Sequence, residues 1–315
     1  MYRGFAVLAL LTFAAFEVVE AKKLNHETKA LRRRMGADWS TIAGNVKIRT
    51  GPSFKPEWMN LYTNSVVKMR ELISKAKSDI DWAKAQLDQD PNALLPADLI
   101  FDVTFLFGCT NDRASLVAKI SDLKTKLDTL SGDHCSGSGL RLSTIKEAGS
   151  TVQSVCNGAN AMMVKGTYLL KYAHTHTHTH NSHTGIADKT KWANFFLSNA
   201  VMDMKYVYVN TEISQMASDA NFIATTLAHE LSHGCLSTTD DVKLPFPNVH
   251  ETVRGFKSTM DFADAANMFR SVDQTNIAVS AYSWESFVQN SPGNYATTAA
   301  GLPKFLDVAA AYAGI

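Results

Sequence analysis

Residues 219–241 read DANFIATTLAHELSHGCLSTTDD and contain the clearest structural signal in the chain. Ser218 or Asp219 can cap the start of a helix, because a side-chain oxygen at that position accepts hydrogen bonds from backbone N–H groups of the first turn. The apolar side chains that follow recur at helical spacing, and Gly234 is a residue type that commonly ends a helix. The stretch therefore predicts a helix over residues 220–233.

This helix carries His229, Glu230 and His233 in the spacing H-E-x-x-H. Histidines four residues apart point to one side of a helix, so both imidazoles can reach a single cation, and neutral imidazole is a good zinc ligand. Glu230 is rotated by about 100° from His229 around the helix axis. Its carboxylate can therefore lie beside the ion and take a proton from an attacking water. The motif predicts a Zn²⁺ site with Glu230 as the general base.

A catalytic zinc site uses a third protein ligand and leaves one position for water. The third histidine of the metzincin class would stand six residues after His233, where this chain has Thr239. The nearest carboxylates are Asp240 and Asp241, and Glu251 is the candidate for a thermolysin-like arrangement. Spacing alone does not decide which of these three carboxylates is the third ligand.

Together these residues resemble the deuterolysin, or aspzincin, family of secreted zinc metalloendopeptidases, some of which prefer lysine after the cut bond. Members follow H-E-x-x-H with a G-T-x-D segment whose aspartate binds the zinc ion. Aligned without gaps, Ser237-Thr238-Thr239-Asp240 takes the place of G-T-x-D, so the resemblance implies that Asp240 is the third ligand. A shift of one residue makes it Asp241. The resemblance also implies an α+β, zincin-like fold, mostly helical, with a small sheet beside the H-E-x-x-H helix.

The resemblance covers roughly residues 56–290. Residues 106–108 (Leu-Phe-Gly) precede a helix expected over 112–130 that closes on Cys135, and they resemble the family's tryptophan-phenylalanine-glycine segment. Residues 280–287 resemble the asparagine-alanine-aspartate segment that leads to a late helix of the family. Both segments agree with the zinc motif.

The chain departs from the family at several positions. Ser237 replaces a glycine, and Ser280 and Tyr282 replace the asparagine and aspartate of the late segment. The family's tyrosine after the ligand aspartate, which hydrogen-bonds the tetrahedral intermediate, has no counterpart here. Loss of such a donor lowers the rate by roughly 10²–10³. The candidates to replace it are Tyr282, Tyr206 and Tyr208.

Hydrophobic periodicity predicts further elements. An apolar face begins after Pro56 and is interrupted by Pro91 and Pro96; its members are Met69, Leu72, Ile73, Ala76, Ile80, Ala83 and Leu87. The helix that ends at Ser131-Gly132 has an apolar stripe of Leu116, Ile120, Leu123, Leu127 and Leu130.

Three other segments are interpreted from composition. The run at 205–210 is rich in aromatic and β-branched residues and predicts a strand, along which an extended peptide can form main-chain hydrogen bonds. Residues 136–160 are rich in Gly, Ser and Thr and are interpreted as mostly loop. Residues 167–172 are interpreted as a short strand.

The amino terminus has the layout of a secretory signal peptide over residues 1–21, with Arg3 before a short apolar run and a possible cleavage site after Ala21. Residues 22–55 are polar and basic and predict an N-terminal extension or a pro-segment. We therefore expect a secreted, extracellular protein.

The rest of the chain, residues 56–315, is predicted to form the metallopeptidase domain. Its helical N-terminal part spans 56–180 and includes a histidine-rich loop at 174–183. Residues 181–290 hold the zinc site, and residues 291–315 form a C-terminal tail.

Four cysteines in an exported protein predict two disulfides, with three possible connectivities. They are Cys109, Cys135, Cys156 and Cys235. Cys109–Cys135 or Cys135–Cys156 would be local bridges, and Cys235 is a candidate free thiol.

Composition limits the partners. The 31 Lys and Arg residues balance 30 Asp and Glu residues, giving a formal net charge of +1, and 45% of the residues are hydrophobic. This balance excludes an intrinsically disordered chain and gives no electrostatic basis for binding nucleic acid. We expect a monomer that acts on a protein or peptide substrate and is not held in a membrane after signal cleavage.

The sequence thus predicts a zinc metalloendopeptidase in which His229, His233 and Asp240 hold the ion and Glu230 is the general base. One alternative is a zincin-fold protein with impaired catalysis that acts as a secreted binding module, which the missing tyrosine favours. Another is a peptidase with Glu251 as third ligand.

Overall fold

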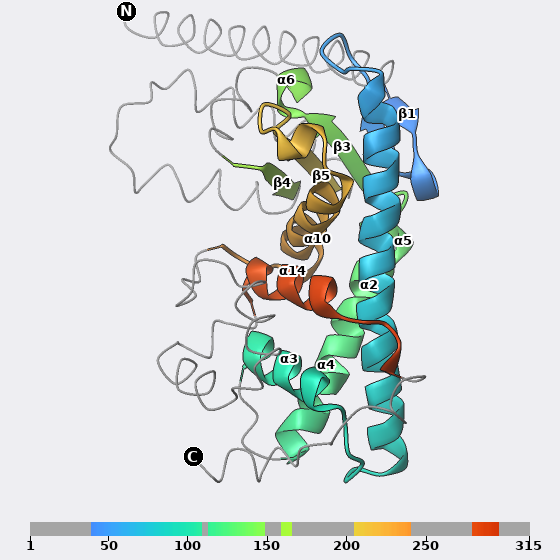
Figure 1. Cartoon of the computed structure of the whole chain (residues 1–315), viewed down its shortest axis with the longest axis vertical. Helices are drawn as coiled ribbons and strands as arrows, with labels where there is room; N and C mark the ends of the chain where they lie inside the picture. Colours follow the sequence, from blue (N-terminus) through green and yellow to red (C-terminus); the bar gives the residue numbers. More distant parts are fainter. Residues whose placement is uncertain (1–38, 109–112, 149–158, 166–204, 241–278, 296–315) are drawn as a thin grey trace, which may run out of the picture.

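The computed structural model describes residues 39–108, 113–148, 159–165, 205–240 and 279–295, which form a mixed α+β fold (Figure 1). In chain order the elements are β1 (Trp39–Thr41), the 3-10 helix η1 (Ala43–Asn45), β2 (Lys47–Arg49), α2 (Glu57–Gln89), α3 (Ala97–Phe107), α4 (Arg113–Ser131), α5 (Asp133–Ser136), β3 (Leu140–Thr144), α6 (Ile145–Ala148), β4 (Ala161–Lys165), β5 (Lys205–Val209), the 3-10 helix η2 (Gln215–Ala217), α10 (Ala220–Leu236) and α14 (Ala281–Asn290). None of the helices in this part of the chain has both the length and the low polarity that a membrane span needs.

Several sequence predictions lie outside the described residues. They are the signal peptide, the strand at 167–172, the histidine-rich loop at 174–183, and the tail beyond residue 295.

The strands form one five-stranded sheet in the order β1-β2-β3-β5-β4. β3 is parallel to both β2 and β5, whereas β1 and β4 run antiparallel to their neighbours. The strand predicted at 205–210 is confirmed as β5. Its expected role as the peptide-binding edge is wrong, because β5 is paired on both sides, with β3 and with β4. Within the described residues, β4 is the edge strand on this side of the sheet.

The sheet also includes residues that the sequence analysis assigned to the N-terminal extension. β1 and β2 lie inside residues 22–55, and β2 pairs with β3. Val46 and Ile48 are buried in the core. The folded part of the chain therefore starts at or before Trp39 rather than at residue 56.

Helix α2 runs along the long axis of the molecule, past the sheet at one end and past α3 and α4 at the other (Figure 1). Its predicted apolar face is confirmed, since Met69, Ile73, Ala76, Ile80, Ala83 and Leu87 are buried. The stripe predicted on α4 is also buried, and α2 packs against both α4 and α10. The buried carboxylate of Asp79 on α2 accepts hydrogen bonds from the backbone N–H groups of Gly293 (2.8 Å) and Tyr295 (3.4 Å), which ties the segment after α14 to α2.

Other parts of the fold were also not foreseen. α3 is apolar on nearly every side, so it shows none of the alternation between polar and apolar faces that marks a surface helix. β3 and α6 lie within residues 136–160, which were interpreted as mostly loop. β3 is short and its Leu140, Leu142, Ser143 and Thr144 are all buried, so it lacks the alternation of a half-exposed strand.

The predicted H-E-x-x-H helix is α10. Asp219 is its N-cap, and one carboxylate oxygen accepts from the backbone N–H groups of Asn221 (2.8 Å) and Phe222 (3.1 Å). The expectation that Gly234 ends the helix is wrong: the helix continues to Leu236 and ends at Ser237, which has the left-handed conformation at φ 60° and ψ 37°. A left-handed residue with a side chain costs roughly 1–2 kcal/mol, so this turn must be held by other contacts.

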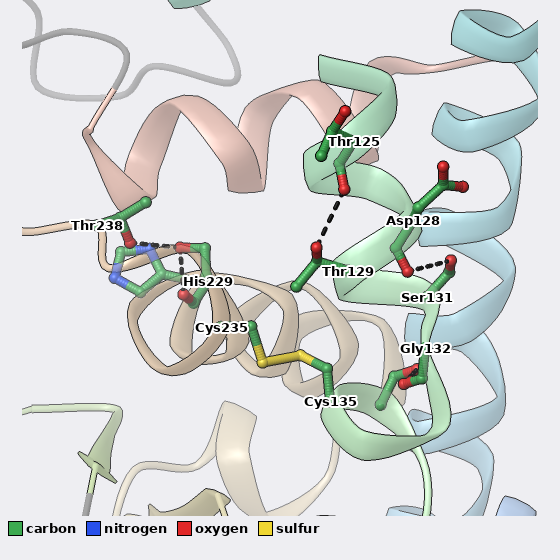
Figure 2. Close-up of a disulfide and its surroundings, with 11 residues drawn as sticks. Thr125, Asp128, Thr129, Ser131, Gly132, Cys135, His229, Cys235 and Thr238 are labelled. Atoms are coloured by element: carbon green, nitrogen blue, oxygen red, sulfur yellow. Dashed lines mark hydrogen bonds between the residues drawn. A yellow bond between two sulfur atoms is a disulfide. The ribbon is translucent and has the colours of Figure 1, made fainter. Parts of the chain in front are cut away.

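A disulfide fastens the same end of α10. Cys235, in the last turn of α10, bonds to Cys135 of α5, with the two Cα atoms 6.2 Å apart (Figure 2). This pairing overturns both local bridges expected for Cys135, and it shows that Cys235 is not a free thiol. Cys109 and Cys156 lie outside the described residues.

Candidate metal centre

α10 places His229 and His233 on one face, as their spacing predicts. Their ring centroids are 4.9 Å apart and their planes are nearly perpendicular, at 83°. Nε2 of His229 lies 3.0 Å from Oδ1 of Asp240, and Nε2 of His233 lies 3.3 Å from Oδ2 of the same carboxylate. The three residues form a group that could hold a metal ion, with one ligand atom from each and all of these atoms within 4.8 Å of one another.

The loop that carries Asp240 is held from two sides. Ser232 of α10 hydrogen-bonds with the hydroxyl of Thr238 (2.8 Å), and its carbonyl accepts from the Thr238 N–H (3.4 Å). On the other side, the N–H of Thr239 donates to the carbonyl of Val279 (2.8 Å), and the N–H of Ala281 donates to the carbonyl of Thr239 (3.2 Å). These contacts support the left-handed turn and position Asp240, although its own side chain is 54% exposed.

The arrangement fits a small divalent ion. Ligands at about 2.0–2.1 Å in a tetrahedron are about 3.3 Å from one another. The distances of 3.0 and 3.3 Å from the two imidazole nitrogens to the carboxylate oxygens match that separation. Two imidazoles and one carboxylate suit several first-row metals, among them zinc.

The other nitrogen of each imidazole is also hydrogen-bonded. Nδ1 of His229 lies 3.0 Å from Oε2 of Glu285 on α14, and Nδ1 of His233 lies 2.9 Å from the carbonyl oxygen of Thr238. Because both partners accept, each Nδ1 carries the hydrogen and each Nε2 is directed toward Asp240. Glu285 was not foreseen as a site residue; it lies within residues 280–287, whose resemblance to the family's late segment gave it no role, and its partner is 56 residues away in sequence.

These contacts change the protonation of all three groups. Burial lowers the pKa of His229, but hydrogen bonds with Asp240 and Glu285 outweigh this effect and raise the pKa to about 10. In His233, hydrogen bonds with Asp240 and Thr238 likewise outweigh burial and raise the pKa. Although burial acts to raise the pKa of Asp240, its hydrogen bonds with the two histidines lower it well below its usual range. Without an ion, His229 therefore holds the extra proton at neutral pH, the pKa of His233 is shifted in the same direction, and a metal would displace protons from the two ligand nitrogens.

Glu230 lies beside this group and is not part of it. Its side chain is buried, and its carboxylate accepts a hydrogen bond from the backbone N–H of Met163 on β4. Burial raises the pKa of Glu230, and the charges of His229 and His233 partly offset that rise. A buried carboxyl group next to the metal ligands is suited to accept and return a proton.

The tyrosines proposed to replace the family's donor differ in position. The ring of Tyr282, in the first turn of α14, meets the ring of His229 at a centroid distance of 4.7 Å and an angle of 67°. Tyr206 and Tyr208 are buried on β5, where their rings stack 6.5 Å apart and Tyr206 also contacts Trp39. Tyr282 therefore contacts His229, one of the two histidines that could hold the ion.

Comparison of the chain with protein-family models, curated proteins and solved structures finds no match. The deuterolysin resemblance therefore stays a prediction from the sequence. Among the other ligand candidates, Asp241 and Glu251 lie outside the described residues. We therefore infer the function from the geometry of His229, His233 and Asp240.

Proposed function

We propose that the protein is a secreted, zinc-dependent metalloendopeptidase of zincin-like fold. The observation that carries the proposal is the convergence of His229, His233 and Asp240, with the buried carboxyl group of Glu230 beside them. When bound, a zinc ion would polarise the scissile carbonyl group and acidify the attacking water.

The residues of the chain would supply the remaining steps. His229, His233 and Asp240 would hold the ion, and Glu285 and Thr238 would fix the orientation of the imidazoles. Glu230 would take a proton from the attacking water and return it to the nitrogen of the leaving amine. General base catalysis of this kind contributes typically 10²–10⁴-fold to the rate.

The outer edge of β4, where no further strand of the described residues pairs, supports a peptide as substrate. The N–H of Asn210 donates to the carbonyl of Asn160 (2.8 Å), just before β4 begins. In an antiparallel pair of strands, residue pairs that exchange backbone hydrogen bonds alternate with pairs that do not. Counting from Asn160, the N–H and C=O groups of Met163 therefore point away from β5. The N–H of Met163 reaches Glu230 on that side. An extended peptide paired with this edge would lie alongside the general base.

A second function has one structural argument in its favour. Asp240 pairs with both histidines, and Glu285 pairs with His229, without an ion. A secreted binding module that had lost catalysis could keep such a charge network. Metal content and turnover together separate the two proposals, because the peptidase requires one ion per chain and must also cleave a peptide.

The deciding experiment combines metal analysis with proteolysis. We expect the purified protein to contain one zinc ion, to cleave an unfolded protein, and to stop when a chelator is added. Glu230→Gln should keep the zinc but lose cleavage, whereas the exposed Glu212→Gln, a matched control, should keep both. Unchanged proteolysis in Glu230→Gln refutes the mechanism, and zinc without any turnover favours the binding module. Comparing zinc content in Asp240→Ala, Asp241→Ala and Glu251→Ala identifies the third ligand.

A further inference from the structure

Tyr282 is the side chain at the centre that the mechanism above does not use. Its side chain is 43% exposed. Among the described residues, the other large hydrophobic side chains that are exposed are aliphatic: Val67, Leu94 and Val279. One side of its ring packs against His229. The exposed remainder is therefore accessible to a molecule that approaches the metal ligands.

The position of Tyr282 is fixed by the same contacts that build the centre. The preceding residue, Ala281, donates its N–H to Thr239, next to Asp240. Glu285 follows one helical turn later, so the two side chains lie on one face of α14 and both contact His229. α14 itself is anchored in the core, where Trp284 and Phe287 pack on Phe107 at centroid distances of 4.8 and 5.2 Å.

Tyr282 lies near two carboxylates of the centre, because Asp240 and Glu285 both reach His229, the residue that its ring contacts. An ordinary phenol, with a pKa of about 10, is already protonated at neutral pH. The hydroxyl is therefore available as a hydrogen-bond donor.

We propose that Tyr282 is a catalytic residue whose hydroxyl donates a hydrogen bond to the scissile carbonyl oxygen as that oxygen becomes an oxyanion. The inference rests on the proposed peptidase function. Water adds its oxygen to the carbonyl carbon, its proton goes to Glu230, and the π-electron pair of the carbonyl moves to the oxygen that Tyr282 stabilises. When the C–N bond breaks, this pair re-forms the carbonyl, and Glu230 gives the proton to the leaving nitrogen. Tyr282 keeps its own proton throughout.

Tyr282→Phe is the informative variant, because it keeps the ring against His229 and removes the donor alone. A donor that acts on the oxyanion typically contributes about 10²–10³ to kcat. We expect kcat to fall by that factor, with the zinc content unchanged. In a Glu230→Gln background, the Kd of an uncleaved peptide should also stay the same with or without Tyr282→Phe.

A second readout does not depend on turnover. A phosphinic analogue of a cleaved peptide carries a tetrahedral, anionic centre, and calorimetry should show that Tyr282→Phe weakens its binding by about 10²-fold, in line with the kinetic effect. Tyr208→Phe on β5 is the matched control and should change neither readout. A Tyr282→Phe variant with wild-type kcat and wild-type affinity for the analogue refutes the assignment, and so does one that loses zinc. A wild-type protein that neither cleaves peptides nor binds the analogue refutes the proposed function and this assignment together.

Discussion

Replacing both Cys135 and Cys235 by serine should strongly destabilise the protein. The bridge joins residues 100 positions apart. On the chain-entropy account, closing a loop of that length stabilises the folded state by about 4.7 kcal/mol relative to the open chain. Measured losses on removing native disulfides are about 2–5 kcal/mol, so we expect a loss of about 3–5 kcal/mol from a total that is typically 5–15 kcal/mol.

Urea unfolding followed by circular dichroism, with zinc present at the same concentration throughout, measures this loss. Peptide mapping of the unreduced wild-type protein should recover the linked Cys135–Cys235 pair. Because the bridge lies two residues beyond His233, the variant should also bind zinc more weakly, whereas Asp219 and the core contacts keep the rest of α10 in place. A double variant within 1 kcal/mol of the wild type, or a native protein in which both thiols react freely, would show that the loop constraint contributes nothing.

Three further predictions concern the metal centre. Glu285→Ala removes the acceptor that orients His229 and should weaken zinc affinity about 10–100-fold in a competition titration with a chromogenic chelator. Glu285→Gln keeps an acceptor oxygen and should lose less affinity. Equal zinc affinities in the wild type and both variants would contradict this role of Glu285. The pKa values of His229 (about 10) and His233 are raised, so zinc must displace protons when it binds at neutral pH. Zinc affinity should therefore increase from pH 6 toward pH 9. Calorimetry of zinc binding at pH 7 should show an enthalpy that depends on the buffer. The stability of the metal-free protein should change with pH in the opposite direction. The two charged histidines stabilise the fold fully below about pH 6.5, the ordinary histidine pKa, and this stabilisation is lost as the pH rises toward 10. Urea midpoints measured across that range would detect the loss.

Local patterns predicted α2 and α4, whose two faces differ in polarity, and β5, whose aromatic and β-branched composition is typical of a strand. The faces of α2 and α4, the composition of β5, and the cap at Asp219 were all read from neighbouring residues. The positions of His229 and His233 also follow from helix geometry alone. α3 and β3 were not predicted, because they are buried on nearly all sides and their sequences therefore lack the periodic alternation of polar and apolar residues.

The remaining features depend on contacts between distant segments. Asp240 could be proposed from the sequence, but its approach to both imidazoles depends on a turn held by α14. The contact between Glu285 and His229 and the bridge between Cys135 and Cys235 join residues 56 and 100 positions apart, respectively. No local rule connects such pairs, because the packing of whole helices brings them together.

The short helix α14 couples local unfolding of the metal centre to the rest of the molecule. It touches His229 through two side chains, binds the loop of Asp240 through its first N–H, and leads directly into the backbone groups that Asp79 holds on α2. Fraying at the end of α10 would therefore disturb contacts that reach the opposite half of the molecule. The centre and the helical half should behave as one cooperative unit, with slow amide exchange that is lost in a single global opening.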